Sequence, residues 1–213
     1  MNREELLAAF TLPTQASVNQ RITKKLLVEN GAVTAADKTA IGDGVEELIW
    51  VAALKPATVG IPAYADADRQ YLEIAVLTLS LREGAKAVRL RELVHRAIPY
   101  PVVLLTAEPH GAILSLCELR NALNEAGKCV LDGDVLATDP TPIRERLSLA
   151  QQPTTNLATV YRSWCDALRP LIRRQSQFAE IESLRRLAEK EPQIAKRIEM
   201  NLRIQSLTAD ANR

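Results

Sequence analysis

The chain has 213 residues, 47% of them hydrophobic and 25% charged, and its 27 basic and 26 acidic residues give a formal net charge of +1. Such a chain can bury a sizeable core, and its near-neutrality excludes nucleic-acid binding by the charge of the whole protein, so any such surface must be a local patch. No apolar run approaches the roughly 18 residues that would span a bilayer, and the start of the chain lacks a signal-peptide pattern, which predicts a cytoplasmic protein without a membrane partner.

The first part of the chain is predicted to be helical. One helix is expected over 18–30, with the Asn30-Gly31 pair as its C-terminal stop. Its apolar stripe consists of Val18, Ile22, Leu26 and Leu27. A second helix begins after Thr34, a favourable N-cap residue, and continues to residue 52 because apolar residues recur at helical spacing. They are Ile41, Val45, Leu48, Ile49 and Ala52. Prolines then predict an extended connector over 55–69.

Residues 71–120 carry the clearest pattern, that of a β-α-β-β unit. A strand over 71–79 has apolar residues on both faces and is therefore expected at the centre of a sheet. A helix over 86–97 follows and is stopped by Pro99-Tyr100-Pro101, where Tyr100 serves either a ligand or the turn. Strands over 102–106 and 112–116 form an antiparallel hairpin around His110-Gly111, and a right-handed crossover is the default if 71–79 and 102–106 are parallel neighbours. Residues 128–131 and 135–137 are expected to extend the sheet edge.

After Pro140 the chain is predicted to be helical to its end. A helix begins near residue 154, and Pro170 is expected to kink or divide it. Amphipathic segments follow on either side of Pro192. Their apolar side chains suit packing on the same domain, on a partner subunit or on a second copy in a homodimer. The candidate partner-binding residues are Ile181, Leu184, Ile194 and Ile198.

Together these elements predict an α+β fold with a central mixed β-sheet built on the β-α-β-β core. A helical N-terminal segment covers 1–62, the α/β core covers 63–139 and a helical C-terminal region covers 140–213. The three cysteines, Cys117, Cys129 and Cys165, are an odd number without short paired spacing. This argues against a disulfide framework and a zinc site and predicts free thiols.

Two basic clusters are the candidate nucleic-acid-binding residues. Arg21, Lys24 and Lys25 share the wetter face of the first helix. On the helix over 86–97, Val88, Leu93, Val94 and Ala97 form the expected buried arc, which leaves Arg89, Arg91, Glu92 and Arg96 near solvent. Such side chains can neutralise phosphates, although a solvated helix face explains them as well. Aromatic residues make up 4% of the chain, so stacking platforms for bases are scarce.

The acidic and histidine residues predict no complete catalytic or metal-binding set. Glu73, Glu83 and Glu92 lack the strand spacing of a metal-dependent nuclease, and Asp132-Gly133-Asp134 is best explained as an acidic turn. His95 and His110 have no serine or cysteine neighbour that would form an activated nucleophile. The sequence therefore predicts no catalytic residues, no metal and no cofactor.

Ordered blocks along nearly the whole chain resemble a bacterial and archaeal family known only as a domain of unknown function. The blocks are 18–26 (VNQRITKKL), 36–38 (ADK), 49–50 (IW), 54–56 (LKP), 61–62 (IP), 71–74 (YLEI), 95–101 (HRAIPYP), 189–191 (EKE) and 196–201 (KRIEMN). The chain departs from the family at Thr23, where proline is usual, and at Pro192, where the closing helix is usually uninterrupted. The resemblance implies genes beside helicases and DNA methyltransferases of restriction or phage-defence loci, and no assigned activity.

Three hypotheses follow. The preferred one is a non-catalytic accessory or adaptor protein that binds a helicase or methyltransferase through its C-terminal helices and the sheet edge. The alternative is a module that binds DNA or RNA through the basic clusters. An enzyme that uses Glu73, Glu92 or His95 is the third, and it requires those groups to converge in one cleft.

Overall fold

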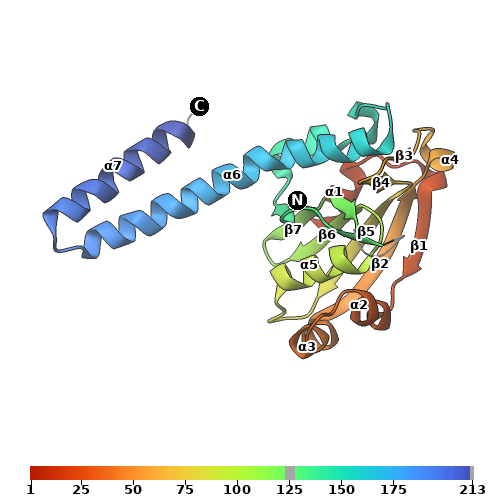
Figure 1. The fold of residues 1–213 in the computed structure, drawn as a ribbon, viewed down its shortest axis with the longest axis horizontal. Coiled ribbons are helices and arrows are strands. Elements are labelled where there is room, and N and C mark those ends of the chain that lie inside the picture. The colour runs from red at the N-terminus through yellow and green to blue at the C-terminus, as the bar shows by residue number, and fades with distance from the viewer. Residues whose placement is uncertain (123–127, 212–213) are drawn as a thin grey trace. The chain divides into compact units, whose positions relative to one another are not determined.

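The computed structural model of the protein describes residues 1–122 and 128–211, with side chains to residue 209. The chain forms two compact units, Met1–Leu168 and Arg169–Arg213. A six-stranded sheet dominates the first unit (Figure 1). Its strands, in spatial order, are β1 (Ser17–Arg21), β2 (Val45–Leu54), β5 (Ile74–Leu81), β6 (Val102–Glu108), β7 (Gly111–Leu116) and β10 (Leu136–Thr138). Strands β5 and β6 are parallel, and the other neighbours are antiparallel, so the sheet is mixed.

Two short ribbons accompany the main sheet. Strand β3 (Tyr64–Ala65) pairs with β4 (Gln70–Tyr71), and β8 (Leu119–Asn121) pairs with β9 (Cys129–Leu131). The remaining short elements lie in connections between strands and helices. They are the helix α4 (Pro56–Val59) and the 3₁₀ segments η1 (Thr14–Ala16), η2 (Thr141–Leu147) and η3 (Leu149–Gln151).

Three helices cover one face of the sheet and close the core on that side. They are α2 (Lys24–Asn30), α3 (Ala35–Gly44) and α5 (Ala87–Ala97). Leu27, Ile41 and Leu93 from these helices pack with Leu48 and Leu77 from the strands in one buried cluster. The crossover helix α5 is therefore held by burial of its apolar arc, which stabilises it far more than helix propensity alone.

The side chains on the other face of the central strands are buried as well. Helix α1 (Arg3–Ala9) contacts β6 and β7, and the ring of Phe10 meets Trp164 edge to face at 5.2 Å. Trp164 lies in the first turns of α6 (Leu157–Lys190). The Tyr161 hydroxyl accepts from the Cys117 N–H at 2.9 Å and lies 2.8 Å from the Val102 carbonyl oxygen, which ties α6 to β6 and the end of β7. The central strands thus have a core on each face.

The predicted fold class is confirmed, because the protein is α+β with a central mixed sheet and helical N-terminal and C-terminal parts. The helix over 86–97 and the hairpin at His110-Gly111 are confirmed, and β5 and β6 are parallel neighbours, which is the condition that the expected crossover required. The helix stop at Gly31 and the N-cap at Thr34 are also confirmed. The segment boundaries at 62 and 139 stay a prediction.

Two predicted helices were wrong over part of their length. Residues 45–52 belong to β2 rather than to a helix, and residues 18–21 belong to β1. The register of β2 against β5 shifts between Val45 and Glu47 and again between Trp50 and Ala52. Each such bulge interrupts the two-residue alternation of a strand, so that apolar residues fall at the three- and four-residue spacing of a helix.

The second unit consists of two helices joined near Pro192. The second half of α6 runs to Lys190, and α7 (Ile194–Ala211) runs back beside it (Figure 1). The predicted break at Pro192 is confirmed. Of the two alternatives predicted for Pro170, a kink or a division of the helix, the division does not occur, since α6 continues through that proline. Among the described residues no helix combines the length and apolarity that crossing a membrane would require.

Candidate interaction surfaces

Arg89 and Arg96 on α5 are paired with carboxylates. Arg89 Nε lies 2.8 Å from Asp37 Oδ1 and its Nη1 lies 2.7 Å from Glu92 Oε2, while Arg96 Nη2 lies 2.6 Å from Glu92 Oε1. The hydrogen-bonded Arg89 guanidinium holds the pKa of the Asp37 carboxyl well below its usual range. Asp37 also accepts from the backbone N–H groups of Val33 and Thr34 at the start of α3. These charges therefore join α3 to α5.

Arg91 and His95 lie on the buried side of α5. The expectation that Arg91 lies near solvent was wrong, because its side chain is buried and pairs with Glu108 at the end of β6. His95 Nε2 lies 3.1 Å from the Ser115 hydroxyl, and burial together with the nearby Arg91 charge lowers the pKa of His95 to about 3. His95 is therefore neutral at physiological pH. Val88, expected in the buried arc, is exposed instead.

The basic residues near β1 are more accessible than those on α5. Arg21 is 69% exposed and lies 3.9 Å from Glu47, and Lys25 lies 3.7 Å from Glu29 on the solvent side of α2. Lys24 donates to the Gly42 carbonyl at 2.7 Å, and burial followed by the Arg82 charge lowers its pKa. Arg21 lies in a strand and the two lysines in a helix, so the predicted single helical face was wrong, although the three residues stay close in the chain.

Glu73, Glu92 and His95 have different partners in the structure. Glu73 Oε2 lies 2.9 Å from Lys55 Nζ, whereas Glu92 binds arginines and His95 meets Ser115. The ion pair with Glu73 raises the pKa of Lys55. Within residues 1–122 and 128–211, no group of three or more His, Cys, Asp or Glu side chains is arranged to hold a metal ion.

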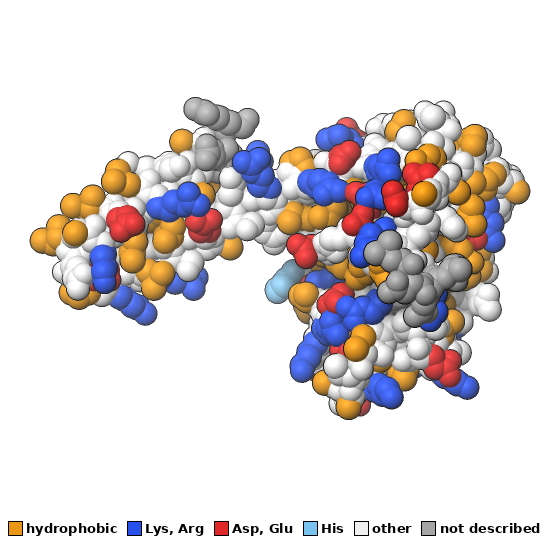
Figure 2. Space-filling model, viewed as in Figure 1, with side chains coloured by type: hydrophobic (Ala, Val, Ile, Leu, Met, Phe, Trp, Pro, Cys, Tyr) orange, Lys and Arg blue, Asp and Glu red, His pale blue; other side chains and the backbone are white. Residues whose placement is uncertain are grey.

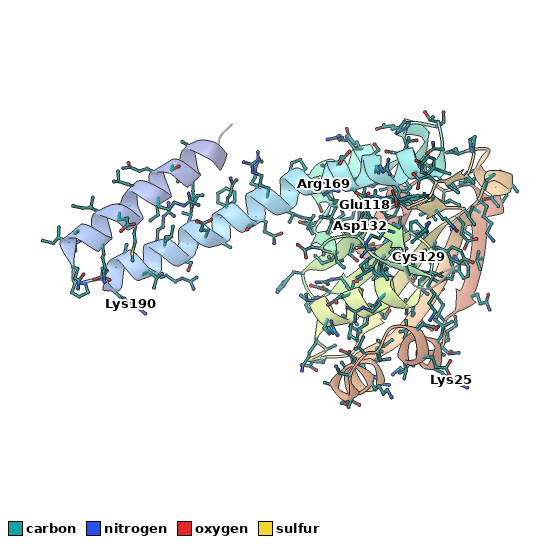
Figure 3. All side chains as sticks on the ribbon, in the orientation of Figure 1. Lys25, Glu118, Cys129, Asp132, Arg169 and Lys190 are labelled. Carbon is teal, nitrogen blue, oxygen red and sulfur yellow. The ribbon has the colours of Figure 1, made fainter. Side chains whose placement is uncertain are left out.

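A charge network that the sequence analysis missed lies where the short ribbons meet the main sheet. Arg69 Nη1 lies 2.6 Å from Glu118 Oε2, and its Nη2 pairs with Asp132. Figure 3 shows Glu118 and Asp132 close together, because they flank the paired residues Leu119 and Leu131 at one end of the β8–β9 ribbon. The acidic turn at Asp132 was predicted, whereas its partner Arg69 lies 63 residues away in the chain, so no local pattern connects the two. The network holds the ribbon connection and requires no ligand.

The three cysteines are free, as the sequence predicts. Burial raises the pKa of the Cys117 thiol to about 11 and also raises the pKa of Cys129. Since the thiolate is the reactive form, both cysteines are poor nucleophiles near neutral pH.

A cavity of about 450 Å³ opens between β1, α2 and the end of α5. Its wall is mainly apolar, and Arg21 and Gln20 lie at its strand side. The apolar wall includes Ile22, Leu26, Trp50, Leu77, Ile98 and Tyr100. The sequence did not predict this site, because Trp50 and Ile22 were predicted to lie in helices. Tyr100, placed between two prolines, was the one signal that pointed to it.

The helical hairpin of the second unit exposes large apolar side chains. Three of them, Ile194, Ile198 and Leu202, are 65%, 54% and 61% exposed and recur every four residues along α7. We call these three residues the α7 stripe. Figure 2 shows hydrophobic side chains scattered among charges over this unit. Of the candidate partner-binding residues, Ile194 and Ile198 are thus exposed, whereas Ile181 is buried and Leu184 is half-buried.

Comparison with protein families gives a match over most of the chain. The model of a family described as Domain of unknown function (DUF4391) matches residues 10–177. This confirms the resemblance to a family of unknown function. No curated protein and no solved structure matches the chain.

Proposed function

The chain belongs to the family described as Domain of unknown function (DUF4391), and we propose that it is a non-catalytic accessory subunit of a bacterial DNA-processing or phage-defence system. In this proposal the protein acts by protein–protein contact through the helical hairpin at its C-terminal end. The α7 stripe is the observation that carries the proposal.

The two sides of α7 differ in a way that supports a partner surface. Leu207 is 5% exposed, and Ile181 and Ala188 on α6 are 4% and 7% exposed, so the hairpin already has an inner apolar seam. Arg203 pairs with Glu180 at 3.1 Å and joins the same two helices. The α7 stripe is additional to this seam. Exposed apolar side chains aligned along one helix face are typical of surfaces that pack on another protein.

The class of partner comes from the family resemblance rather than from the residues. Gene neighbourhood in that family implies a helicase or DNA methyltransferase of the same locus, which is an associational argument. The charged side chains that could have suggested an enzyme are engaged in pairs inside the first unit, as for Glu73 with Lys55 and Arg89 with Asp37. These pairs suit a scaffold that presents a binding surface.

The test is co-purification of the full chain with the helicase or methyltransferase encoded beside it. We expect a complex that survives raised salt, because apolar contacts are not screened. The combined substitutions Ile194→Ser, Ile198→Ser and Leu202→Ser should abolish it while the helical circular dichroism is kept. Lys196→Ser with Glu199→Ser, on exposed positions of the same helix, is the matched control and should leave the complex intact. If the triple variant still forms the complex, the α7 stripe does not bind the partner.

The alternative function is binding of DNA or RNA through the cluster of Arg21, Lys24 and Lys25. The observation in its favour is the exposure of Arg21 and Lys25 on neighbouring elements. Arg89, Arg91 and Arg96 support it less, since they face an equal number of carboxylates, Asp37, Glu92 and Glu108. Light scattering with short duplex and single-stranded DNA at two salt concentrations tests it, because phosphate contacts weaken steeply with salt. The same measurement shows whether the protein is a homodimer.

A further inference from the structure

The cavity beside β1 adjoins a free sheet edge. Strand β1 is the first strand of the six-stranded sheet and pairs with β2, and each of its five residues is exposed. In the part of the chain that the structure describes, no strand pairs with its other side. Gln20 and Arg21 at the end of this strand, together with the next residue, Ile22, also line the cavity. The free edge and the cavity therefore form one continuous surface.

The backbone of Arg21 is directed away from β2. The Ile22 N–H donates to the Leu48 carbonyl at 2.8 Å, while Arg21 is paired in register with Ile49. Alternate residues of an antiparallel strand turn their N–H and C=O groups to opposite sides. Because the Ile22 N–H bonds to β2, the N–H and C=O of the preceding residue, Arg21, point to the side of β1 that has no neighbouring strand. They are available to a strand that pairs with β1 beside the cavity.

The first part of β1 is less suited to such pairing. Asn19 has φ +50°, and the register against β2 shifts between Ser17 and Gln20. A bulge of this kind twists an edge and blocks unlimited pairing with other strands. Pairing is therefore confined to the short regular end at Gln20 and Arg21, which favours a short segment over a full strand.

The chemistry of the surface favours an apolar side chain next to a carboxylate. The indole N–H of Trp50 donates to the Ala52 carbonyl at 2.8 Å, so the ring is held in place and offers the cavity its apolar surface. Leu26 is 36% exposed in the cavity wall. At the rim, Arg21 is mostly exposed and only loosely paired with Glu47. A volume near 450 Å³ is in the range of protein ligand sites, about 300–1,000 Å³.

We propose that this surface, the β1 cavity, binds a short extended segment of a protein partner, with an aliphatic or aromatic side chain in the cavity and a carboxylate at Arg21. The segment pairs with the outward N–H and C=O of Arg21, in the manner of strand addition to a sheet edge. The proposal rests on the proposed role in protein–protein contact but uses a different surface from the α7 stripe. Loss of binding at one surface therefore leaves binding at the other to be measured.

The first experiment selects binders to the full chain from a pool of random capped hexapeptides. We expect enrichment of peptides in which an aliphatic or aromatic residue adjoins Asp or Glu. Binding of the best synthetic peptide is then followed by tryptophan fluorescence, because Trp50 lies in the cavity wall whereas Trp164 is fully buried. Absence of enrichment, or enrichment of basic peptides, would overturn the proposal.

Substitutions in the wall and at the rim test whether the peptide binds in the β1 cavity. Leu26→Asp should weaken the peptide at least about tenfold by placing a charge in the apolar wall. Arg21→Ala removes the charge and should weaken it several-fold, whereas Arg21→Pro also removes the outward N–H and should weaken it further. Proline is tolerated at such an edge position because no bond to β2 is lost. If Arg21→Pro fails to fold, the other two variants decide.

The matched control is Val88→Asp, which places the same charge on an exposed residue of α5 outside the cavity. It should bind the peptide like the unaltered protein. Equal binding by Leu26→Asp and the unaltered protein would refute the site. Displacement of the peptide by a single-stranded oligonucleotide of ten thymidines would assign the cavity to nucleic acid instead. A triple substitution in the α7 stripe should leave peptide affinity unchanged.

Discussion

His95 shows how a single residue in this protein is set by its surroundings rather than by its chemistry. It is 1% exposed, lies 3.1 Å from the Ser115 hydroxyl and has Arg91 nearby. Burial disfavours the charged imidazolium, and the nearby Arg91 charge repels it, so the pKa of His95 falls to about 3. A histidine that appears available for acid–base chemistry in the sequence is a neutral core residue in the fold.

This gives a prediction for the pH dependence of stability. Between about pH 6.5 and pH 3 the unfolded chain protonates His95 while the folded chain does not, so the free energy of unfolding must fall as the pH falls through this range. From pH 7 to pH 5 the His95 contribution should drop by about 2 kcal/mol. His95→Gln, which keeps a polar group near Ser115, should lose less stability over this interval, as measured by urea unfolding. If the free energy of unfolding fell equally in His95→Gln and in the unaltered protein, His95 would not be the buried neutral histidine that the structure shows.

Asp37 also makes the free energy of unfolding fall as the pH falls, but at lower pH than His95 does. Its pKa is depressed chiefly by the hydrogen-bonded Arg89, so its contribution to stability is present above the ordinary aspartate range and is lost as the pH falls towards the depressed value. The comparison of His95→Gln with the unaltered protein cancels this contribution, because Asp37 is common to both. Asp37 lies in the first turn of α3, and its partner Arg89 lies 52 residues away in the chain.

At the scale of elements, the end of α2 is placed by close contact with α5. A Cβ on Gly31 would lie 2.6 Å from the Leu93 carbonyl oxygen and 2.9 Å from that of Leu27. The backbone at Gly31 is right-handed, so glycine is required here for space rather than for a left-handed turn. The Asn30-Gly31 stop was predicted from the sequence, whereas the reason for the glycine is tertiary.

Gly31→Ala should therefore destabilise the protein by about 1–3 kcal/mol, because the contacting atoms are backbone and cannot move cheaply. Gly42→Ala is the matched control, since a Cβ there has no neighbour within 4 Å and alanine favours the helix α3. It should be neutral or stabilising by up to about 1 kcal/mol. Chemical unfolding of both variants measures the difference. A Gly31→Ala protein as stable as Gly42→Ala would show that α2 does not pack on α5 this closely.

Strand β2 shows why local patterns predicted some elements and not others. Strands β5 and β6 were predicted because they are central and rich in apolar residues, although β5 begins at Ile74 rather than at Tyr71, which lies in β4. Strand β2 has two register shifts, and β1 is fully exposed and irregular at Asn19. An exposed edge strand lacks the alternation of apolar and polar residues that predicts a strand. In a bulged strand this alternation is interrupted. The cavity was missed for the same reason, since it depends on where β1 and β2 lie.

At the scale of the whole molecule, the first unit has the contacts of an independent domain. It holds both cores of the sheet, and the family match ends at residue 177, a short distance beyond Leu168. Tyr161 and Trp164, both fully buried in this unit, lie in the first turns of α6. These turns are therefore part of the domain core.

A chain that ends at residue 177 should fold, with a thermal midpoint within a few degrees of the full chain. A chain that ends at Asn156 should not, because it lacks the Tyr161 hydroxyl between β6 and β7 and the Trp164 ring against Phe10. Circular dichroism during heating distinguishes the two. An unfolded 1–177 chain would show that the first unit depends on the hairpin.

By itself the sequence determined the α+β class, the helix over 86–97 between two central strands, the hairpin at His110-Gly111, the break at Pro192 and the family. Each of these depends on residues close in the chain, such as prolines, glycines and apolar repeats, whose preferences are local. Only the tertiary structure decided that β1 and β2 complete the sheet, that Arg91 and His95 are buried, and that Trp50 and Tyr100 meet in a cavity. Those outcomes depend on pairing and packing between residues far apart in the chain, which no local pattern records.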